Sequence, residues 1–144
     1  MEIMQKMTLE IQLIGLLRLV IALFLGIMVG YERRNRHKEA GIKTHAIVAM
    51  GSALVMLISK YGFFDVAEYD GSRIAAQIIS GVGFLGAGII FVKYSGISGL
   101  TTAAGVWAIS GVGMAIGAGL YILGIGATIL MLLTQIMTHR NYTG

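Results

Sequence analysis

Arg18 is the residue whose type and position most clearly suggest chemistry, because it interrupts an apolar run from about Leu9 to Tyr31. A charge near the centre of a membrane helix costs about 2.5–3.5 kcal/mol, so it is usually kept for a reason. Small residues at four-residue spacing share its helix face: Ala22, Gly26 and Gly30. We expect Arg18 to point into a helix bundle. It acts there either as a strut, bonded to carbonyls, a polar side chain or a carboxylate of the 65–70 loop, or as a group that handles a ligand or an ion.

A second group of polar residues opens a later apolar stretch. Asp70 precedes this stretch, and Arg73, Gln77 and Gly81 share one helix face because they recur every four residues. An acid before a helix and a base in its first turn predict a cap and a local ion pair. The group is either an interfacial anchor or the rim of a polar cavity that also contains Arg18.

Residues that could support catalysis or metal binding are scarce. The sequence has no cysteine, no carboxylate pair within the apolar stretches and no histidines at metal-ligand spacing. Mg²⁺ prefers carboxylate ligands and retained waters, whereas the only charge deep in an apolar stretch is positive. We therefore predict a protein that is not an enzyme, with no metal and no cofactor. His45, where a later stretch begins, is either structural or a proton carrier.

Glycines form two further patterns. Gly81, Gly83 and Gly86 match G-x-G-x-x-G, but they lie in an apolar stretch of membrane length rather than between a strand and a helix, which argues against nucleotide binding. With Gly88 they predict close helix packing or a locally loosened helix. Gly113 and Gly117 are spaced to pack helices or subunits.

The composition and the long apolar stretches predict membrane helices, which position the residues described above. Of 144 residues, 56% are hydrophobic and 12% charged, which excludes disorder, a nucleic-acid module and an ordinary soluble enzyme. A membrane helix needs roughly 20 apolar residues. We predict an all-α integral membrane protein, a single domain over 1–144 without a cleaved signal peptide. Its five spans are about 9–31, 44–61, 73–93, 101–117 and 119–137.

The loops and ends of these spans indicate an orientation. Seven basic residues fall on one side of the predicted spans, in the 32–43 loop, at Lys93 and at Arg140. The positive-inside rule places that side in the cytoplasm, so the N-terminus faces outside and the C-terminus the cytoplasm. Residues 1–10 could lie amphipathically in the outer interface. Glycines at 117 and 119 predict the turn between the last two spans, and Thr44 and Thr101 or Thr102 are candidate helix caps.

Three ordered motifs resemble the MgtC/SapB family of bacterial membrane proteins. They are GYERRNRHKEAGIKTHAIVAMGSAL (30–54), SRIAAQIISGVGFLGAGIIF (72–91) and GLTTAAGVWAISGVGMAIGAGLY (99–121). The resemblance implies about five spans in the inner membrane and a link to magnesium limitation. It also points to a set of functional positions: Arg18, Glu32, Arg33, Thr44, His45, Asp70, Arg73, Gln77, the 81–88 glycines, Thr101 and Thr102.

The sequence departs from the family's pattern in two places. Asp70, Gly71 and Ser72 stand where many relatives have Asp-Pro, and the chain ends at Gly144 without the soluble C-terminal domain of longer members. Any function that belongs to that domain is therefore not expected in this chain.

Two functional hypotheses follow. The first is a non-enzymatic regulator in the lipid bilayer, which acts through helix contacts with other membrane proteins or with itself as a homo-oligomer and binds no nucleic acid. The second is a transporter or channel in which Arg18, Gln77 and Thr102 line a polar path for a small ion. The family label suggests Mg²⁺ as that ion, whereas the buried arginine suits an anion. An enzyme that acts on lipid is a distant third.

Overall fold

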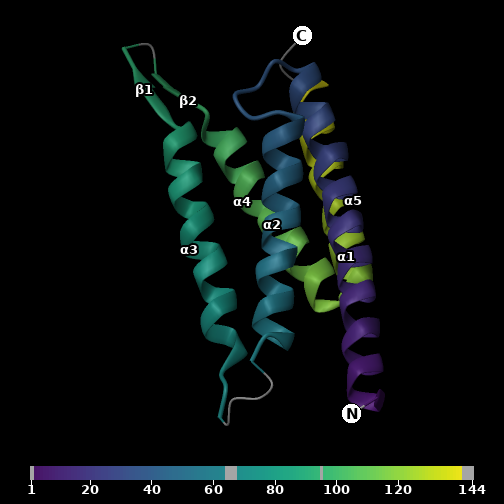
Figure 1. The fold of residues 1–144 in the computed structure, drawn as a ribbon. Coiled ribbons are helices and arrows are strands. Elements are labelled where there is room, and N and C mark those ends of the chain that lie inside the picture. The colour runs from purple at the N-terminus through teal and green to yellow at the C-terminus, as the bar shows by residue number, and fades with distance from the viewer. Residues whose placement is uncertain (1, 64–67, 95, 141–144) are drawn as a thin grey trace.

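The computed structural model describes residues 2–63, 68–94 and 96–140. Within these residues the chain forms five helices and one short hairpin (Figure 1). They are α1 (Glu2–Asn35), α2 (Ile42–Tyr61), α3 (Gly71–Ile89), β1 (Phe91–Lys93), β2 (Gly96–Ser98), α4 (Leu100–Ala118) and α5 (Tyr121–Arg140). Four of the helices, α1 to α4, are long and apolar enough to cross a membrane. The prediction of a helical protein with several membrane-spanning helices is therefore confirmed.

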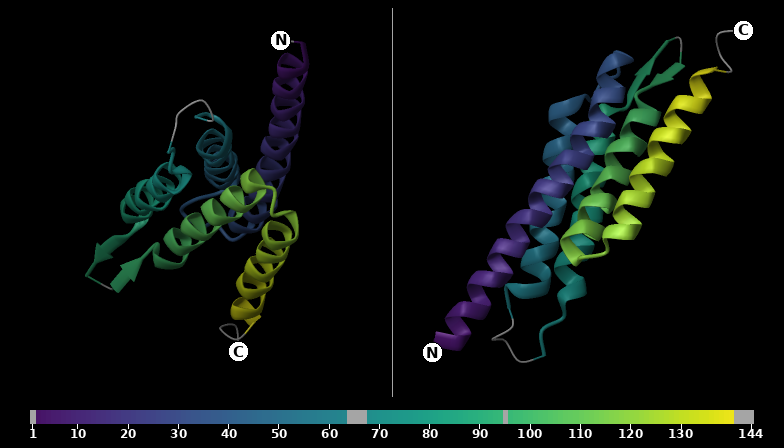
Figure 2. Two further views of the ribbon diagram at one scale, coloured as in Figure 1. Left: turned by 90° about the horizontal axis from the view of Figure 1, so that it is seen from below. Right: turned by 90° about the vertical axis from the view of Figure 1, so that its right-hand side faces the viewer.

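The fifth helix runs back beside α4, as Figure 2 shows. Its apolar part, Tyr121–Met137, is shorter than the four helices that qualify by length and composition, so the fifth predicted span stays a prediction. The turn before it lies where the glycines predict: Gly119 ends α4 with a φ of 90°, and its N–H group bonds back to the carbonyl of Ile116. A left-handed residue at this position favours glycine.

The bundle is built around α2 and α4. Gly26 and Gly30 bring the backbone of α1 against the first turns of α2, while Gly113 and Gly117 bring α4 against α2 further along its length. Apolar side chains from these three helices fill the space between them: Ala22, Leu25, Val29, Ala49, Ala53, Ile109, Val112 and Ile116. The helices pack closely because their contact faces carry little side-chain volume.

The predicted end of the third span is wrong. The helix α3 stops at Ile89, Ile90 is extended, and the chain enters a hairpin in which Val92 pairs with Ile97. Gly99, with a φ of 85°, then turns the chain into α4. The hydropathy of residues 90–92 suits a membrane helix, but β-branched and aromatic residues before a glycine-containing turn also suit a short strand.

The start of the chain and two helix caps also differ from expectation. No break separates residues 2–10 from the first span, since α1 is continuous from Glu2. Thr44 and the Thr101–Thr102 pair do not cap their helices, because the N-cap positions are Gly41 and Gly99 and carry no side-chain bond.

The start of α1 and the end of α5 lie at opposite ends of the bundle (Figure 1). The α1–α2 loop lies at the same end as the hairpin, so most of the basic loop residues gather there, as the sequence suggests. The end of α2 and the start of α3 lie toward the N-terminal end of α1, whereas the α4–α5 turn lies beside the middle of α1, where Arg18 contacts Gly117.

The orientation gives a labelling prediction. The sequence has no cysteine, so the exposed residues Lys38 and Glu68 can each be replaced by a single cysteine. With the N-terminus outside, we expect a membrane-impermeant maleimide to label Glu68→Cys in intact spheroplasts and Lys38→Cys only after permeabilisation. The reverse pattern would place the N-terminus in the cytoplasm.

Candidate functional site

The polar side-chain contacts between helices form two groups at opposite ends of α4. The Arg18 cluster consists of Arg18, Lys60, Tyr61 and Tyr121. The Glu32 cluster consists of Glu32, Arg33, Arg36, Glu39, His45, Thr102 and Gln135. Arg18 and Glu32 belong to the same helix and are about 21 Å apart along its axis.

Arg18 binds the turn between α4 and α5. Its Nε donates to the Tyr121 hydroxyl at 3.0 Å, and its Nη1 donates to the Gly117 carbonyl at 2.9 Å and to the Tyr61 hydroxyl at 3.4 Å. Both tyrosine rings also lie about 6 Å from the guanidinium carbon, at the outer limit of a cation–π contact. Of the partners that the sequence suggested, Arg18 therefore has a backbone carbonyl and polar side chains. No described carboxylate pairs with Arg18.

Lys60 adds a second cation at the same turn. Its Nζ donates to the Ala118 carbonyl at 3.1 Å and lies 5.3 Å from the centre of the Tyr61 ring. The last carbonyls of a helix carry partial negative charge and have no partner within the helix. Arg18 and Lys60 therefore stabilise the C-terminal end of α4, which is a structural use of both charges.

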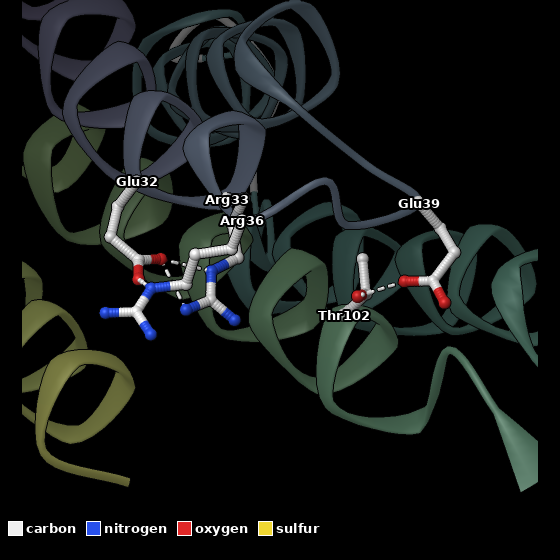
Figure 3. A network of polar contacts seen from close by, with 5 residues as sticks. All are labelled: Glu32, Arg33, Arg36, Glu39 and Thr102. Atoms are coloured by element: carbon white, nitrogen blue, oxygen red, sulfur yellow. Dashed lines mark hydrogen bonds and ion pairs between the residues drawn. The ribbon is translucent and has the colours of Figure 1, made fainter. Parts of the chain in front are cut away.

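Figure 3 shows two separate contacts in the Glu32 cluster: Glu32 pairs with arginines around the end of α1, and Glu39, in the α1–α2 loop, meets Thr102 at the start of α4. The Glu32 carboxylate pairs with both Arg33 and Arg36, and Arg33 is only 3% exposed. Beside them, the buried Thr102 hydroxyl donates to Glu39 Oε2 at 2.6 Å. A buried arginine that shares a carboxylate with a second arginine is held in place by ionic hydrogen bonds.

His45 lies deeper in the bundle and is completely buried. Its Nδ1 is 2.9 Å from the carbonyl of Gly41, the N-cap residue of α2, and its Nε2 has no hydrogen-bond partner among the described residues. Gln135, on α5, has a buried side-chain oxygen that is also without a partner. Between them lies Gly105 of α4, which contributes no side chain.

The predicted polar path is not formed. Arg18 and Thr102 belong to the two separate clusters, and the apolar core around Val112 lies between them. Gln77, the third predicted member, is exposed on α3 and so faces the surroundings of the bundle. Thr44 and Thr101 are likewise exposed.

Asp70 caps α3, as predicted. Its carboxylate accepts hydrogen bonds from the Ser72 amide and hydroxyl, which lower the pKa of Asp70, and the positive charge of Arg73 lowers it further. The expected ion pair between Asp70 and Arg73 is absent from the part of the chain that the structure describes. Both side chains are exposed, so this group does not form a cavity with Arg18.

The glycines of α3 do not all pack. Gly86 alone of the four faces a neighbour, since a side-chain carbon there would lie 3.7 Å from the Ala103 Cβ. Around Gly81, Gly83 and Gly88 the corresponding positions are open, and α3 runs unbroken through all of them. Within the chain these three glycines contact no neighbouring helix and do not interrupt α3, so their packing against another chain stays a prediction.

Several residues of both clusters were not identified from the sequence: Lys60, Tyr61, Tyr121, Arg36, Glu39, Gly105 and Gln135. Tyr61 and Tyr121 stand at ends of apolar runs, where interfacial tyrosines are common. Gln135 is the one amide in the last apolar stretch. No group of three or more metal-ligating residues occurs among the described positions.

Comparison with known proteins adds the family. The MgtC family profile matches residues 19–142. The "Putative magnesium transporter YhiD" of Escherichia coli K12 is 47% identical over 130 residues, which cover 87% of this chain and 60% of that protein. "Protein MgtC" of Salmonella typhimurium LT2 is 40% identical over 125 residues, which cover 87% of this chain and 52% of that protein.

An uncharacterized protein of Haemophilus influenzae is 41% identical over 138 residues. The chain spans a little over half the length of these relatives. No solved structure matches. With four apolar helices of spanning length and a profile match over most of its sequence, this multi-pass membrane protein belongs to the MgtC family.

Proposed function

We propose that this chain is a non-enzymatic regulator of the bacterial inner membrane, linked to magnesium limitation, which acts through contacts between membrane helices. Its N-terminus faces outside and its C-terminus the cytoplasm. The observation that carries the proposal is the outward face of α3, the least buried of the four long helices.

The outward face of α3 has the features of a helix-contact surface. Gln77, Gly81, Phe84 and Gly88 recur at helical spacing, and Phe84 is 81% exposed. Glycines let a second helix backbone approach closely, and an amide in the membrane gains a hydrogen bond when it meets a partner. A second copy of the chain or another membrane protein can supply that partner.

The interior of the bundle supports the same proposal. Apolar side chains close the space between the two polar clusters, and the charged groups at each end bind backbone carbonyls or one another. Gly113 and Gly117, candidates for a subunit contact in the sequence, instead face the backbone of α2. The contact surface is therefore expected on α3 rather than on α4.

A double substitution tests this surface. We expect Gly81→Leu with Gly88→Leu to fold, because both positions are open. The added side chains should abolish association in the membrane, measured by crosslinking, and the cellular phenotype under magnesium limitation. Gly111→Leu, at an equally open position on α4, is the matched control. Association and phenotype that both survive the double substitution would contradict the proposal.

Transport is the second candidate function, since one relative is named a "Putative magnesium transporter". A conductor of Mg²⁺ would need carboxylates or carbonyls along a continuous path. We expect purified protein in liposomes to show no Mg²⁺ flux above empty liposomes. Mg²⁺ flux well above that of empty liposomes would favour transport over regulation.

A further inference from the structure

A groove of about 620 Å³ runs between the N-terminal half of α1 and the C-terminal half of α2. Its walls extend along α1 from Thr8 to Leu19 and along α2 from Leu54 to Gly62. Thr8 and Leu19 are 11 positions apart, which corresponds to about 16 Å of helix. The hydrocarbon core of a bilayer is roughly 30 Å thick, so the groove has the depth of one membrane leaflet.

The two ends of this groove differ in polarity. Gln12 and Tyr61 belong to its walls at the end where α2 stops, whereas the deeper walls are formed by leucines 16, 19 and 54. Leu16 and Leu54 are exposed, so the groove is open to the surroundings of the bundle. Both helices are long and apolar enough to cross a membrane, and the hydrocarbon of a bilayer holds no water to fill an apolar groove. An acyl chain therefore suits the deep part, and a polar headgroup suits the end beside Tyr61.

Two cations lie close to the tyrosine at the polar end. Lys60 Nζ is 5.3 Å from the centre of the Tyr61 ring, and the guanidinium carbon of Arg18 is 6.0 Å from it. Lys60 is exposed, and its ammonium group has three donors. The Ala118 carbonyl accepts one of them, which leaves the ammonium group able to donate to a ligand as well.

The acids described nearby do not neutralise these cations. Glu10 lies on the face of α1 opposite the groove, since a helix turns about 100° per residue. The Asp70 carboxylate accepts hydrogen bonds from Ser72 at the start of α3. Neither Arg18 nor Lys60 forms an ion pair with a carboxylate in the part of the chain that the structure describes. The polar end of the groove is therefore positively charged and complementary to a phosphate group.

We propose that the groove between α1 and α2 holds one anionic phospholipid, with an acyl chain against the leucines and the phosphate beside Lys60. The ammonium group donates a charge-assisted hydrogen bond to the phosphate, and the nearby guanidinium of Arg18 adds to the attraction. The lipid belongs to the leaflet on the N-terminal side of α1, whichever way the protein is oriented. The site is separate from the outward face of α3, so it does not depend on the proposed regulatory role.

Native mass spectrometry of the purified chain tests the headgroup contact. We expect one phosphatidylglycerol to remain bound at concentrations at which phosphatidylcholine with the same acyl chains does not. Lys60→Gln should weaken phosphatidylglycerol binding roughly fivefold, the effect of one basic residue near a membrane surface. Lys43→Gln, which removes an exposed charge at the other end of α2, is the matched control and should have no effect. Equal binding of the two lipids, or equal losses in the two variants, would overturn the proposal.

Filling the groove tests the acyl-chain contact. A side-chain carbon on Gly15 would lie 3.6 Å from Leu57 Cδ1, an ordinary contact, so Gly15→Leu places its side chain in the groove. We expect this variant to lose the bound lipid, and Gly111→Leu, at an open position on α4, to keep it. Leu54→Phe enlarges an exposed wall residue and serves as a second groove-filling variant in case Gly15→Leu does not fold.

Two results of the groove-filling experiment would contradict a lipid site. One is phosphatidylglycerol that stays bound with wild-type affinity to a folded groove-filling variant. The other is a wild-type dimer without bound lipid that Gly15→Leu separates into monomers, which would assign the groove to a second copy of the chain.

Discussion

Replacing Gly113 with alanine should destabilise the protein strongly, although it adds only one methyl group. A side-chain carbon at this position would lie 2.1 Å from the Ala49 carbonyl oxygen and 3.0 Å from the Ser52 Cβ. The oxygen belongs to the backbone of α2, so relief requires the two central helices to separate. Overpacking of a core costs typically 1–3 kcal/mol and occasionally more, and we expect about 3 kcal/mol for this substitution.

Gly111→Ala provides the matched control for this experiment. It makes the same chemical change two residues earlier in α4, where nothing lies within 4 Å of the added carbon. Thermal unfolding in detergent should show a large fall in Tm for Gly113→Ala and no fall for Gly111→Ala. Equal Tm values for both variants would mean that α2 and α4 are not in backbone contact.

Arg18→Leu has the second largest expected effect, and it acts in two directions. The variant should insert into the membrane more readily, since a central charge costs about 2.5–3.5 kcal/mol on insertion scales. It should also lose the bonds that hold the α4–α5 turn to α1 and α2. Hydrogen bonds to charged groups contribute about 1.5–3 kcal/mol each but do not add, so we expect a net loss of about 2–4 kcal/mol in the folded bundle.

Smaller substitutions separate the contributions at this turn. Tyr121→Phe removes only the 3.0 Å bond to Nε and should cost about 1 kcal/mol. The same change in the Arg18→Leu background should cost less, because the bond is already gone. Unchanged thermal stability in Arg18→Leu, with normal insertion, would show that Arg18 is not a strut and would leave ligand handling as its role.

The helices were largely predictable because apolar runs of membrane length leave few alternatives. The end of α3 was not, since residues 90–92 are as apolar as the helix before them and only the three-dimensional pairing of Val92 with Ile97 makes them a strand. The glycine patterns also could not be interpreted from local sequence alone. Gly113 packs and Gly81 does not, yet both belong to similar small-residue motifs, because the motif does not specify which helix lies in the centre.

The candidate sites were predictable only in part, for a related reason. Arg18 was identified because a charge in an apolar stretch is costly to bury. Its partners Tyr61, on α2, and Tyr121, on α5, are 43 and 103 positions away in the sequence. Glu39 and Thr102, 63 positions apart, were likewise brought together by packing. No local spacing encodes such pairs, so the predicted path through Arg18, Gln77 and Thr102 combined residues that the fold keeps apart.

The glycine contacts between α2 and α4 also determine how the molecule can move. Gly113 and Gly117 place the two backbones against each other with no side chain between them, and a contact of that kind has no slack for one helix to slide along the other. Any conformational change must carry α2 and α4 together as one rigid body. Gly26 and Gly30 hold α1 against α2 in the same way, so displacement is expected mainly at α5 and at α3, the helix whose outward face is open to a partner.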